Sequence, residues 1–221
     1  MRNELTTDKL GRPIQNKVLI EVTDIFNEFT TKSGVIVYNS AHEDSWGDSP
    51  GYKISNFFIR HGTVIYPPER LVPDSFDYET EIEVEPGDIV YFNIVAFKSS
   101  QALVMGERKF LLVHYKELIL RVRNGKICPI NGCGVFSPVK EETTFGVYTN
   151  VKDKTAKWEL KIKPEKLPVE LNHRYHFDDI WEVGDIVYLK VGDKPFQVEG
   201  DFNKELGEIY CCPMRMIIAD A

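Results

Sequence analysis

One seven-residue phrase occurs twice in this chain in nearly the same form. Residues 85–91 read Glu-Pro-Gly-Asp-Ile-Val-Tyr, and residues 182–188 read Glu-Val-Gly-Asp-Ile-Val-Tyr. Gly-Asp is typical of a tight turn and Ile-Val-Tyr of a strand, so the phrase predicts a corner that leads into a strand. Further apolar strands follow each copy and end in similar closing strands, at residues 117–121 and 215–219. A repeat this long indicates two related β-domains in tandem, because solenoid repeats span only roughly 20–50 residues.

The length and composition suit two small all-β domains. The chain has 221 residues, of which 43% are hydrophobic and 12% aromatic. Short apolar runs between glycine and proline turns indicate small barrels or sandwiches, and helix should be scarce because no long helical period appears. We expect an N-terminal arm at residues 1–12, a first unit at 13–123 and a diverged second unit at 124–221. The second unit is placed there because Pro-Ile-Asn at residues 129–131 echoes Pro-Ile-Gln-Asn at residues 13–16.

Apolar and β-branched runs predict the strands of the first unit. One of them is bent at Gly62, since glycine inside a strand marks a bend or a close approach. The expected strands are residues 18–22, 57–66, 81–84, 102–104, 110–113 and 118–120.

Charge and hydropathy exclude several classes of partner. The formal net charge is −7 and the isoelectric point is about 5.3, which argues against a nucleic-acid partner or an anionic membrane surface. No apolar run approaches the about 20 residues that span a bilayer. The first nine residues have no apolar signal core. We therefore expect a cytoplasmic protein.

We expect no enzyme, no cofactor and no metal site. The sequence contains no glycine-rich phosphate loop, no paired-carboxylate signature and no nucleophile elbow. The cysteine spacing matches no standard zinc pattern, so these thiols are interpreted as small buried hydrophobes. The alternative is a metal site, because the first and a late strand of the second domain could bring two cysteines together. The side chains weighed as metal ligands are Cys128, Cys133, Cys211, Cys212, His42, His173 and His176.

The first unit resembles the GroES co-chaperonin family over its whole length. Five segments in order carry the resemblance: a first strand, a mobile loop with Thr-Lys-Ser-Gly and an apolar tripeptide, a strand leading to a roof, the repeated corner and the closing strands. They are residues 17–22, 30–38, 62–65, 83–93 and 107–122. The second unit keeps the corner and the closing strands but has diverged elsewhere.

The resemblance implies an irregular β-barrel for each unit and a homo-oligomeric ring near sevenfold symmetry that caps a GroEL-type chaperonin. In that family the apolar tripeptide of the loop docks into a groove on the chaperonin's apical domain. The corresponding segment here is Gly34, Val35, Ile36, Val37 and Tyr38. The last of these departs from the family, which usually has an aliphatic residue at that position.

The residues of this loop agree with a docking role. Polar residues flank the apolar triplet, and ordering a loop costs about 1–2 kcal/mol per residue, so a single contact is weak. A ring of such loops would then bind by avidity. The alternative interpretation is that residues 35–38 are a core strand. In the second unit, residues 143–150 echo the loop faintly and are interpreted as a degenerate or lost docking loop, with a structural turn as the favoured alternative. The roof segments correspond to residues 70–80 and 165–178, and the alternative is that these are ordinary solvated loops.

The sequence therefore supports two functions. The first is a tandem co-chaperonin that assists protein folding by capping an ATP-driven chaperonin. The second is a structural ring component of a bacteriophage virion or tail, with other phage structural proteins as partners. Two observations favour the second: only one unit keeps a docking loop, and that loop is followed by bulky residues suited to fixed packing, namely Trp46, Tyr52, Phe57 and Phe58.

Overall fold

The computed structural model describes most of both units. The described residues are 5–6, 9–13, 15–22, 28–30, 36–38, 59–72, 78–93, 101–139, 157–170, 180–190, 195–198 and 200–220. In this part of the chain strands dominate. Helical structure there is limited to the four-residue α2 (Asn203–Leu206) and to short 3-10 turns, which include η4 (Tyr115–Glu117) and η5 (Met214–Met216). The all-β class predicted from the sequence is therefore confirmed.

The strands follow the chain from both predicted units. They are β1 (Leu5–Thr6), β2 (Lys17–Val22), β3 (Glu28–Thr30), β4 (Ile36–Tyr38), β5 (Ile59–Tyr66), β6 (Tyr78–Glu79), β7 (Ile89–Asn93), β8 (Gln101–Met105), β9 (Arg108–His114), β10 (Leu118–Arg123), β11 (Lys126–Pro129), β12 (Cys133–Pro138), β13 (Lys157–Ile162), β14 (Val169–Glu170), β15 (Ile186–Leu189), β16 (Phe196–Val198), β17 (Ile209–Pro213) and β18 (Ile217–Asp220).

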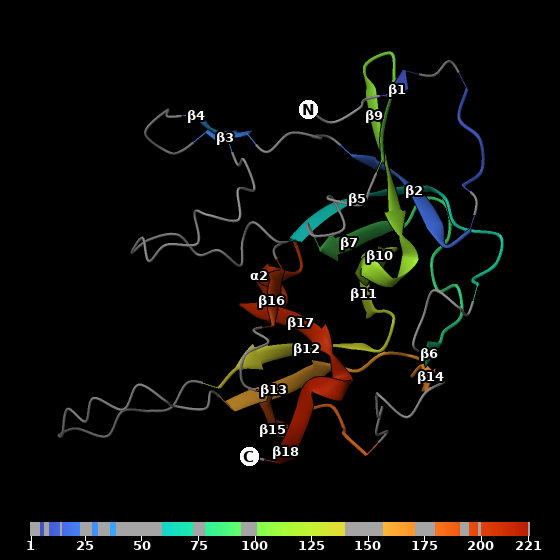
Figure 1. Cartoon of the computed structure of the whole chain (residues 1–221). Helices are drawn as coiled ribbons and strands as arrows, with labels where there is room; N and C mark the ends of the chain where they lie inside the picture. Colours follow the sequence, from blue (N-terminus) through green and yellow to red (C-terminus); the bar gives the residue numbers. More distant parts are fainter. Residues whose placement is uncertain are drawn as a thin grey trace.

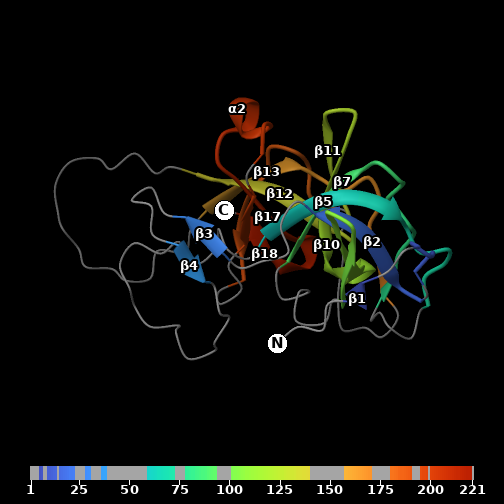
Figure 2. The same ribbon diagram turned by 90° about the horizontal axis from the view of Figure 1, so that it is seen from above.

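Two larger sheets hold most of these strands. The first has the order β1-β8-β9-β2-β5-β7-β10-β11, and the second has the order β16-β17-β12-β13-β15-β18. All neighbours in them are antiparallel except β1 and β8, which are parallel. Figure 1 shows the first sheet in blue and green above the second in yellow, orange and red, and Figure 2 shows them from above.

The two sheets repeat one strand order. Six strands of the first sheet, β8-β9-β2-β5-β7-β10, correspond one for one to β16-β17-β12-β13-β15-β18 of the second. The last strand of each six follows a 3-10 turn, η4 or η5. Because six strands in one order with the same connections are unlikely to arise independently, the duplication read from the repeated phrase extends to the topology.

The repeated phrase forms the same corner twice. Gly87 and Gly184 have φ of +93° and +102°, a left-handed conformation that side chains with a Cβ adopt only with strain. The amide of Gly87 donates to the carbonyl of Val64 on β5, and that of Gly184 donates to the carbonyl of Leu160 on β13, each at 2.8 Å. Each corner is thus tied to the neighbouring strand at the point where β7 or β15 begins.

The aspartate of each corner closes the turn. The Asp88 carboxylate accepts a hydrogen bond from the amide of Glu85, and the Asp185 carboxylate accepts one from the amide of Glu182, each at 2.8 Å. A carboxylate that caps its own turn explains why Gly-Asp occurs in both copies.

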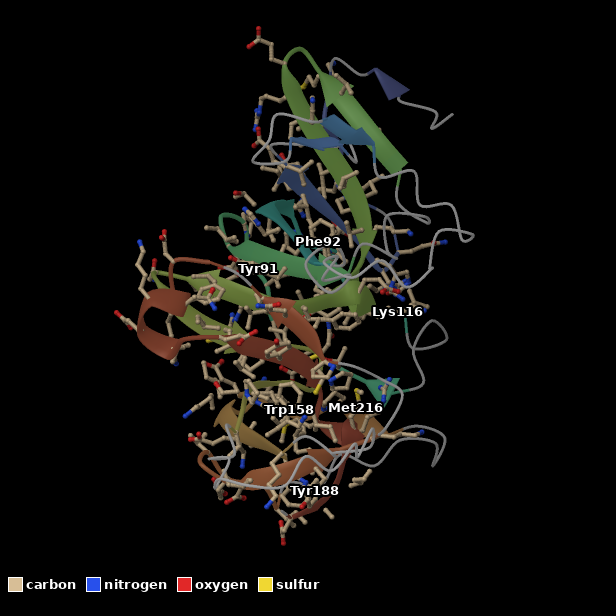
Figure 3. The ribbon with its side chains drawn as sticks, turned by 90° about the vertical axis from the view of Figure 1, so that its left-hand side faces the viewer. Tyr91, Phe92, Lys116, Trp158, Tyr188 and Met216 are labelled. Atoms are coloured by element: carbon tan, nitrogen blue, oxygen red, sulfur yellow. The ribbon has the colours of Figure 1, made fainter. Side chains whose placement is uncertain are left out.

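Three apolar clusters form the core. The first lies mainly in the first unit, includes Phe92 of β7 and also contains Ile130 of the second unit, and the third lies inside the second unit and includes Met216. The second cluster is shared: it combines Tyr91, Ile119, Leu120 and Ile127 with Cys133, Val135, Val198, Ile209 and Cys211. Figure 3 shows Tyr91 between the two units. The units are therefore joined by a common core.

One expected strand is wrong. Residues 81–84 form no regular strand, because side chains satisfy their backbone groups in place of a neighbouring strand. The Tyr115 hydroxyl donates to the carbonyl of Glu81 at 2.9 Å and accepts from the amide of Glu83 at 2.7 Å. The Arg121 guanidinium donates to the carbonyl of Glu83 at 2.5 Å. The apolar alternation alone could not reveal these partners.

The other expected strands of the first unit are present as parts of β2, β5, β8, β9 and β10. Of the expected bent strand, residues 59–66 form β5, and residues 57–58 lie outside the described part. The turn at residues 124–125 joins β10 to β11 within the first sheet, so the start of the second unit in sequence still pairs with the first unit.

Candidate docking site and the junction between the units

The predicted docking segment ends in a small hairpin. β3 and β4 pair antiparallel, with Glu28 opposite Tyr38 and Thr30 opposite Ile36. This two-stranded ladder is separate from both larger sheets, and it stands apart from them in Figure 1. The core-strand interpretation of these residues would require β4 to belong to one of the two large sheets, and β4 belongs to neither.

The structure places only part of this site. The backbone of Ile36, Val37 and Tyr38 forms β4. Gly34 and Val35 lie outside the described residues, as do residues 143–150 of the second unit. The docking role of this segment therefore remains a prediction.

The two segments expected to form roofs meet at their stems. β6 and β14 pair antiparallel, with Val169 opposite Glu79 and Glu170 opposite Tyr78. Lys166 forms an ion pair with Glu81. The sequence did not predict this pairing, because each strand is only two residues long and its partner is in the other unit.

A charged junction beneath these stems links the two units. Arg121 of β10 is buried and donates to the Glu165 carboxylate at 3.0 Å. Lys126 lies 3.4 Å from the same carboxylate, and the Cys128 thiol donates to it at 3.6 Å. Glu165 of the second unit is thus held by three groups from β10 and β11.

Glu83 contributes the one carboxyl group of this junction with a strongly raised pKa. Burial raises the pKa of Glu83 to about 7, although a hydrogen bond from the backbone amide of Asn131 and the charge of Arg121 act in the opposite direction. The Asn131 amide donates to Oε2 of Glu83 at 2.9 Å, and the Asn131 side chain donates to the carbonyls of Tyr115 and Leu118 at 2.9 and 2.8 Å. A hydrogen bond across the junction therefore joins a carboxyl group of the first unit to a backbone amide of the second.

These junction residues were missed by the sequence analysis. The available signal was an arginine, Arg121, inside the apolar closing strand, where a buried charge needs a partner. Its partner Glu165 is distant in sequence, so the pair could not be identified without the fold. The junction holds segments of the two units against each other.

The four cysteines are free and buried. Cys133 and Cys211 come from paired strands, as the sequence analysis considered, and their side chains interact. That interaction and burial raise the pKa of Cys211 well above its usual value, and burial raises that of Cys212. Cys133 and Cys211 lie in the apolar cluster shared by the two units, where free thiols pack as small hydrophobic groups.

The other metal candidates are not placed. His42, His173 and His176 lie outside the described residues. Within the described part, no group of three or more His, Cys, Asp or Glu side chains is arranged to hold a metal ion. No helix in that same part is long and apolar enough to cross a membrane.

The sequence was compared with protein-family models and with curated proteins, and neither comparison gave a match.

Proposed function

We propose that this chain is a co-chaperonin-like ring protein that caps an ATP-driven chaperonin and assists protein folding. It docks through residues 34–38, with Ile36, Val37 and Tyr38 as the contact residues. The first unit supplies this segment, and the second unit supplies a second copy of the strand framework.

The separate β3–β4 hairpin is the observation that carries this proposal. A segment that belongs to neither large sheet can bind a partner without disturbing the strand pairing of either unit. Its sequence, an apolar triplet next to Thr, Ser and Gly, suits β-strand or groove docking, in which alternate side chains give specificity. Weak single contacts multiplied around a ring would give tight but reversible capping.

The test measures complex formation between the purified protein and a bacterial chaperonin in the presence of ATP. We expect the wild-type protein to bind and Ile36→Ser/Val37→Ser to abolish binding. The matched control, Val147→Ser/Tyr148→Ser, changes the corresponding segment of the second unit and should leave binding intact. Equal binding by both double variants would contradict docking through residues 34–38.

A structural ring component of a phage virion or tail is the second candidate. The shared core between the units favours it, because a rigid two-unit block suits a fixed assembly. A wild-type protein that forms a stable ring and binds no chaperonin would support this candidate.

A further inference from the structure

The carboxyl group of Glu83 lies at the contact between the two units. It belongs to the first unit, and its Oε2 accepts a hydrogen bond from the backbone amide of Asn131 in the second unit at 2.9 Å. The backbone of Glu83 is held by the first unit, because its amide donates to the Tyr115 hydroxyl and its carbonyl accepts from the Arg121 guanidinium. Among the described residues, the carboxyl itself is bonded to a neutral amide and to no guanidinium or ammonium group.

The nearby Arg121 guanidinium is paired with a different carboxylate. Its Nη2 donates to Oε2 of Glu165 at 3.0 Å. The Arg121 side chain is 10% exposed and that of Glu165 is 53% exposed, so water can hydrate Glu165 when this partner is withdrawn. The Nε of Arg121 is buried and has no hydrogen-bond partner within the described residues. Arg121 therefore has a donor left for a second carboxylate beside it.

Charged and titratable groups from several segments surround Glu83. They are Glu81 and Glu85 on its own segment, Asp88 at the corner, Tyr115 of η4, Arg121 and Arg123 of β10, Lys126 and Cys128 of β11, and Glu165 and Lys166 before β14. The positive side chains among them are paired with carboxylates other than Glu83.

These surroundings favour a proton on Glu83. Burial raises the pKa of Glu83 to about 7, and the charge of Glu165 acts in the same direction. The Asn131 amide, Arg121 and Lys166 act in the opposite direction and do not outweigh burial. The proton is therefore lost near neutral pH, at a carboxyl that joins the two units.

We propose that the proton on Glu83 is a switch for the contact between the units. With the proton bound, Arg121 holds Glu165, and the stems β6 and β14 stay paired, side by side in Figure 1. When the proton leaves, Arg121 turns to the new carboxylate, because an unpaired charge costs more when it is buried than when it is exposed. Residues 165–170 then lose their tie to β10, and the two-residue pairing of β6 with β14 opens.

The direction of the switch follows from two values of one pKa. The pKa of Glu83 is about 7 in the closed junction, and we expect its ordinary value of 4.5 in the open junction, where the carboxyl meets water. Closure is therefore strongest below pH 4.5 and is lost as the pH rises through 7. From about pH 5.5 to about pH 7.5 the equilibrium constant for opening should rise by about twentyfold. This switch goes beyond the proposed function and acts in the single chain.

The test uses the thiol of Cys128 as a reporter in the full-length chain. Cys128 is 5% exposed and donates to Glu165 at 3.6 Å, so we expect release of residues 165–170 to uncover it. N-ethylmaleimide is added at about pH 5.5 and about pH 7.5, the modified cysteines are located by mass spectrometry, and each rate is divided by that of N-acetylcysteine at the same pH. The normalised rate at Cys128 should rise by about twentyfold. It should exceed the rate at Cys211, which is 0% exposed and lies in the shared core.

Two variants separate Glu83 from other effects of pH. Glu83→Gln keeps the shape of the protonated side chain and cannot ionise, so its normalised rate at Cys128 should stay within about twofold between the two pH values. Glu85→Gln is the matched control, since Glu85 is on the same segment and its side chain is 68% exposed; it should keep the wild-type rise.

Three results would overturn the proposal. They are a normalised wild-type rate at Cys128 that does not rise with pH, equal rates at Cys128 and Cys211, and the same rise in Glu83→Gln as in the wild-type protein. The first two need no variant. Because no chaperonin is present, failure here leaves the docking role of residues 34–38 to its own test.

Discussion

The first unit covers the edge of its last strand with β11, whereas the second unit leaves β18 as the terminal strand of its sheet. The strand order, the Gly-Asp corner and the bulge are common to both units. The two units therefore share the hydrogen-bond framework of the fold and differ in what surrounds it. Within the described residues, the difference is the covered edge of β10, where the second unit contacts the first. The β3–β4 hairpin is the proposed docking site for a partner.

The largest expected difference in the free energy of unfolding is between substitutions of the two residues skipped in the strand pairing, Ile119 of β10 and Ile218 of β18. Ile119→Ala should lower the free energy of unfolding by about 2–5 kcal/mol, because it leaves a cavity in the shared core. Ile218→Ala should change it by less than about 0.5 kcal/mol, because the side chain is exposed in the single chain. Urea denaturation at low protein concentration measures both. Similar losses would show that the two positions are not in different environments.

The next comparison concerns the space beside β5. The first unit has Gly62 at the position where β13 of the second unit has Trp158. A Cβ at Gly62 would lie 2.5 Å from the carbonyl oxygen of Glu21 and 2.5 Å from Cγ2 of Ile20. Gly62→Ala should therefore destabilise by about 1–3 kcal/mol through overpacking. Gly11→Ala is the control, since nothing lies within 4 Å of its Cβ position. Thermal melting of both variants checks this, and an unchanged melting temperature for Gly62→Ala would contradict the close approach of β2 and β5.

The half-buried Glu83 of the first unit corresponds in position to Ile180 of the second unit, which is exposed. The pKa of Glu83 is about 7 in the folded protein against 4.5 normally, so the folded state binds this proton more tightly than the unfolded state. Stability should therefore fall as the pH rises from about 4.5 to about 7, by about 1–3 kcal/mol. Glu83→Gln should flatten the dependence of the unfolding free energy on pH between 5 and 8, and Ile180→Gln should not. If the unfolding free energies of the wild-type protein and of Glu83→Gln changed with pH in parallel, the Glu83 carboxyl would not be the cause of the pH dependence.

The smallest expected difference in the free energy of unfolding is between substitutions of the two corner aspartates, Asp88 and Asp185. Burial acts to raise the pKa of Asp88, but hydrogen bonds from Arg123 and from the Glu85 amide outweigh it and leave the pKa lowered. The Arg123 guanidinium donates to both carboxylate oxygens of Asp88 at 2.7 Å. Asp88→Asn should cost about 1–2 kcal/mol more than Asp185→Asn near neutral pH.

The sign of the Asp88 effect sets its pH window. A lowered pKa in the folded state gives stability that is present above the ordinary value of 3.8 and is lost as the pH falls through the lower folded value. The excess cost of Asp88→Asn should therefore shrink in acid below about pH 4. Chemical denaturation at pH 7 and at pH 3 measures this, and an excess cost that stays constant would contradict the ion pair with Arg123.

The framework was predictable from the sequence because its signals are local. Apolar and β-branched runs predicted β2, β5, β9 and β10, and the repeated Gly-Asp corner indicated the duplication. These features depend on turn geometry and side-chain alternation, which neighbouring residues determine.

The junction was not predictable because its partners are distant in sequence. Residues 81–84 have the alternation of a strand, yet Tyr115 and Arg121 bind their backbone. The pairing of β6 with β14 and the contact of Arg121 with Glu165 join the two units across many intervening residues. Only the packed structure brings these groups together.

The most direct test of the docking proposal is hydrogen exchange of the backbone amides of β3 and β4, measured with and without chaperonin and nucleotide. We expect faster exchange in this hairpin than in β2 and β12 of the free protein, and a strong slowing when the chaperonin is added. Exchange in β12 and β13 of the second unit should stay unchanged. Equal exchange in β3 and β4 with and without a bound chaperonin would contradict docking through this hairpin.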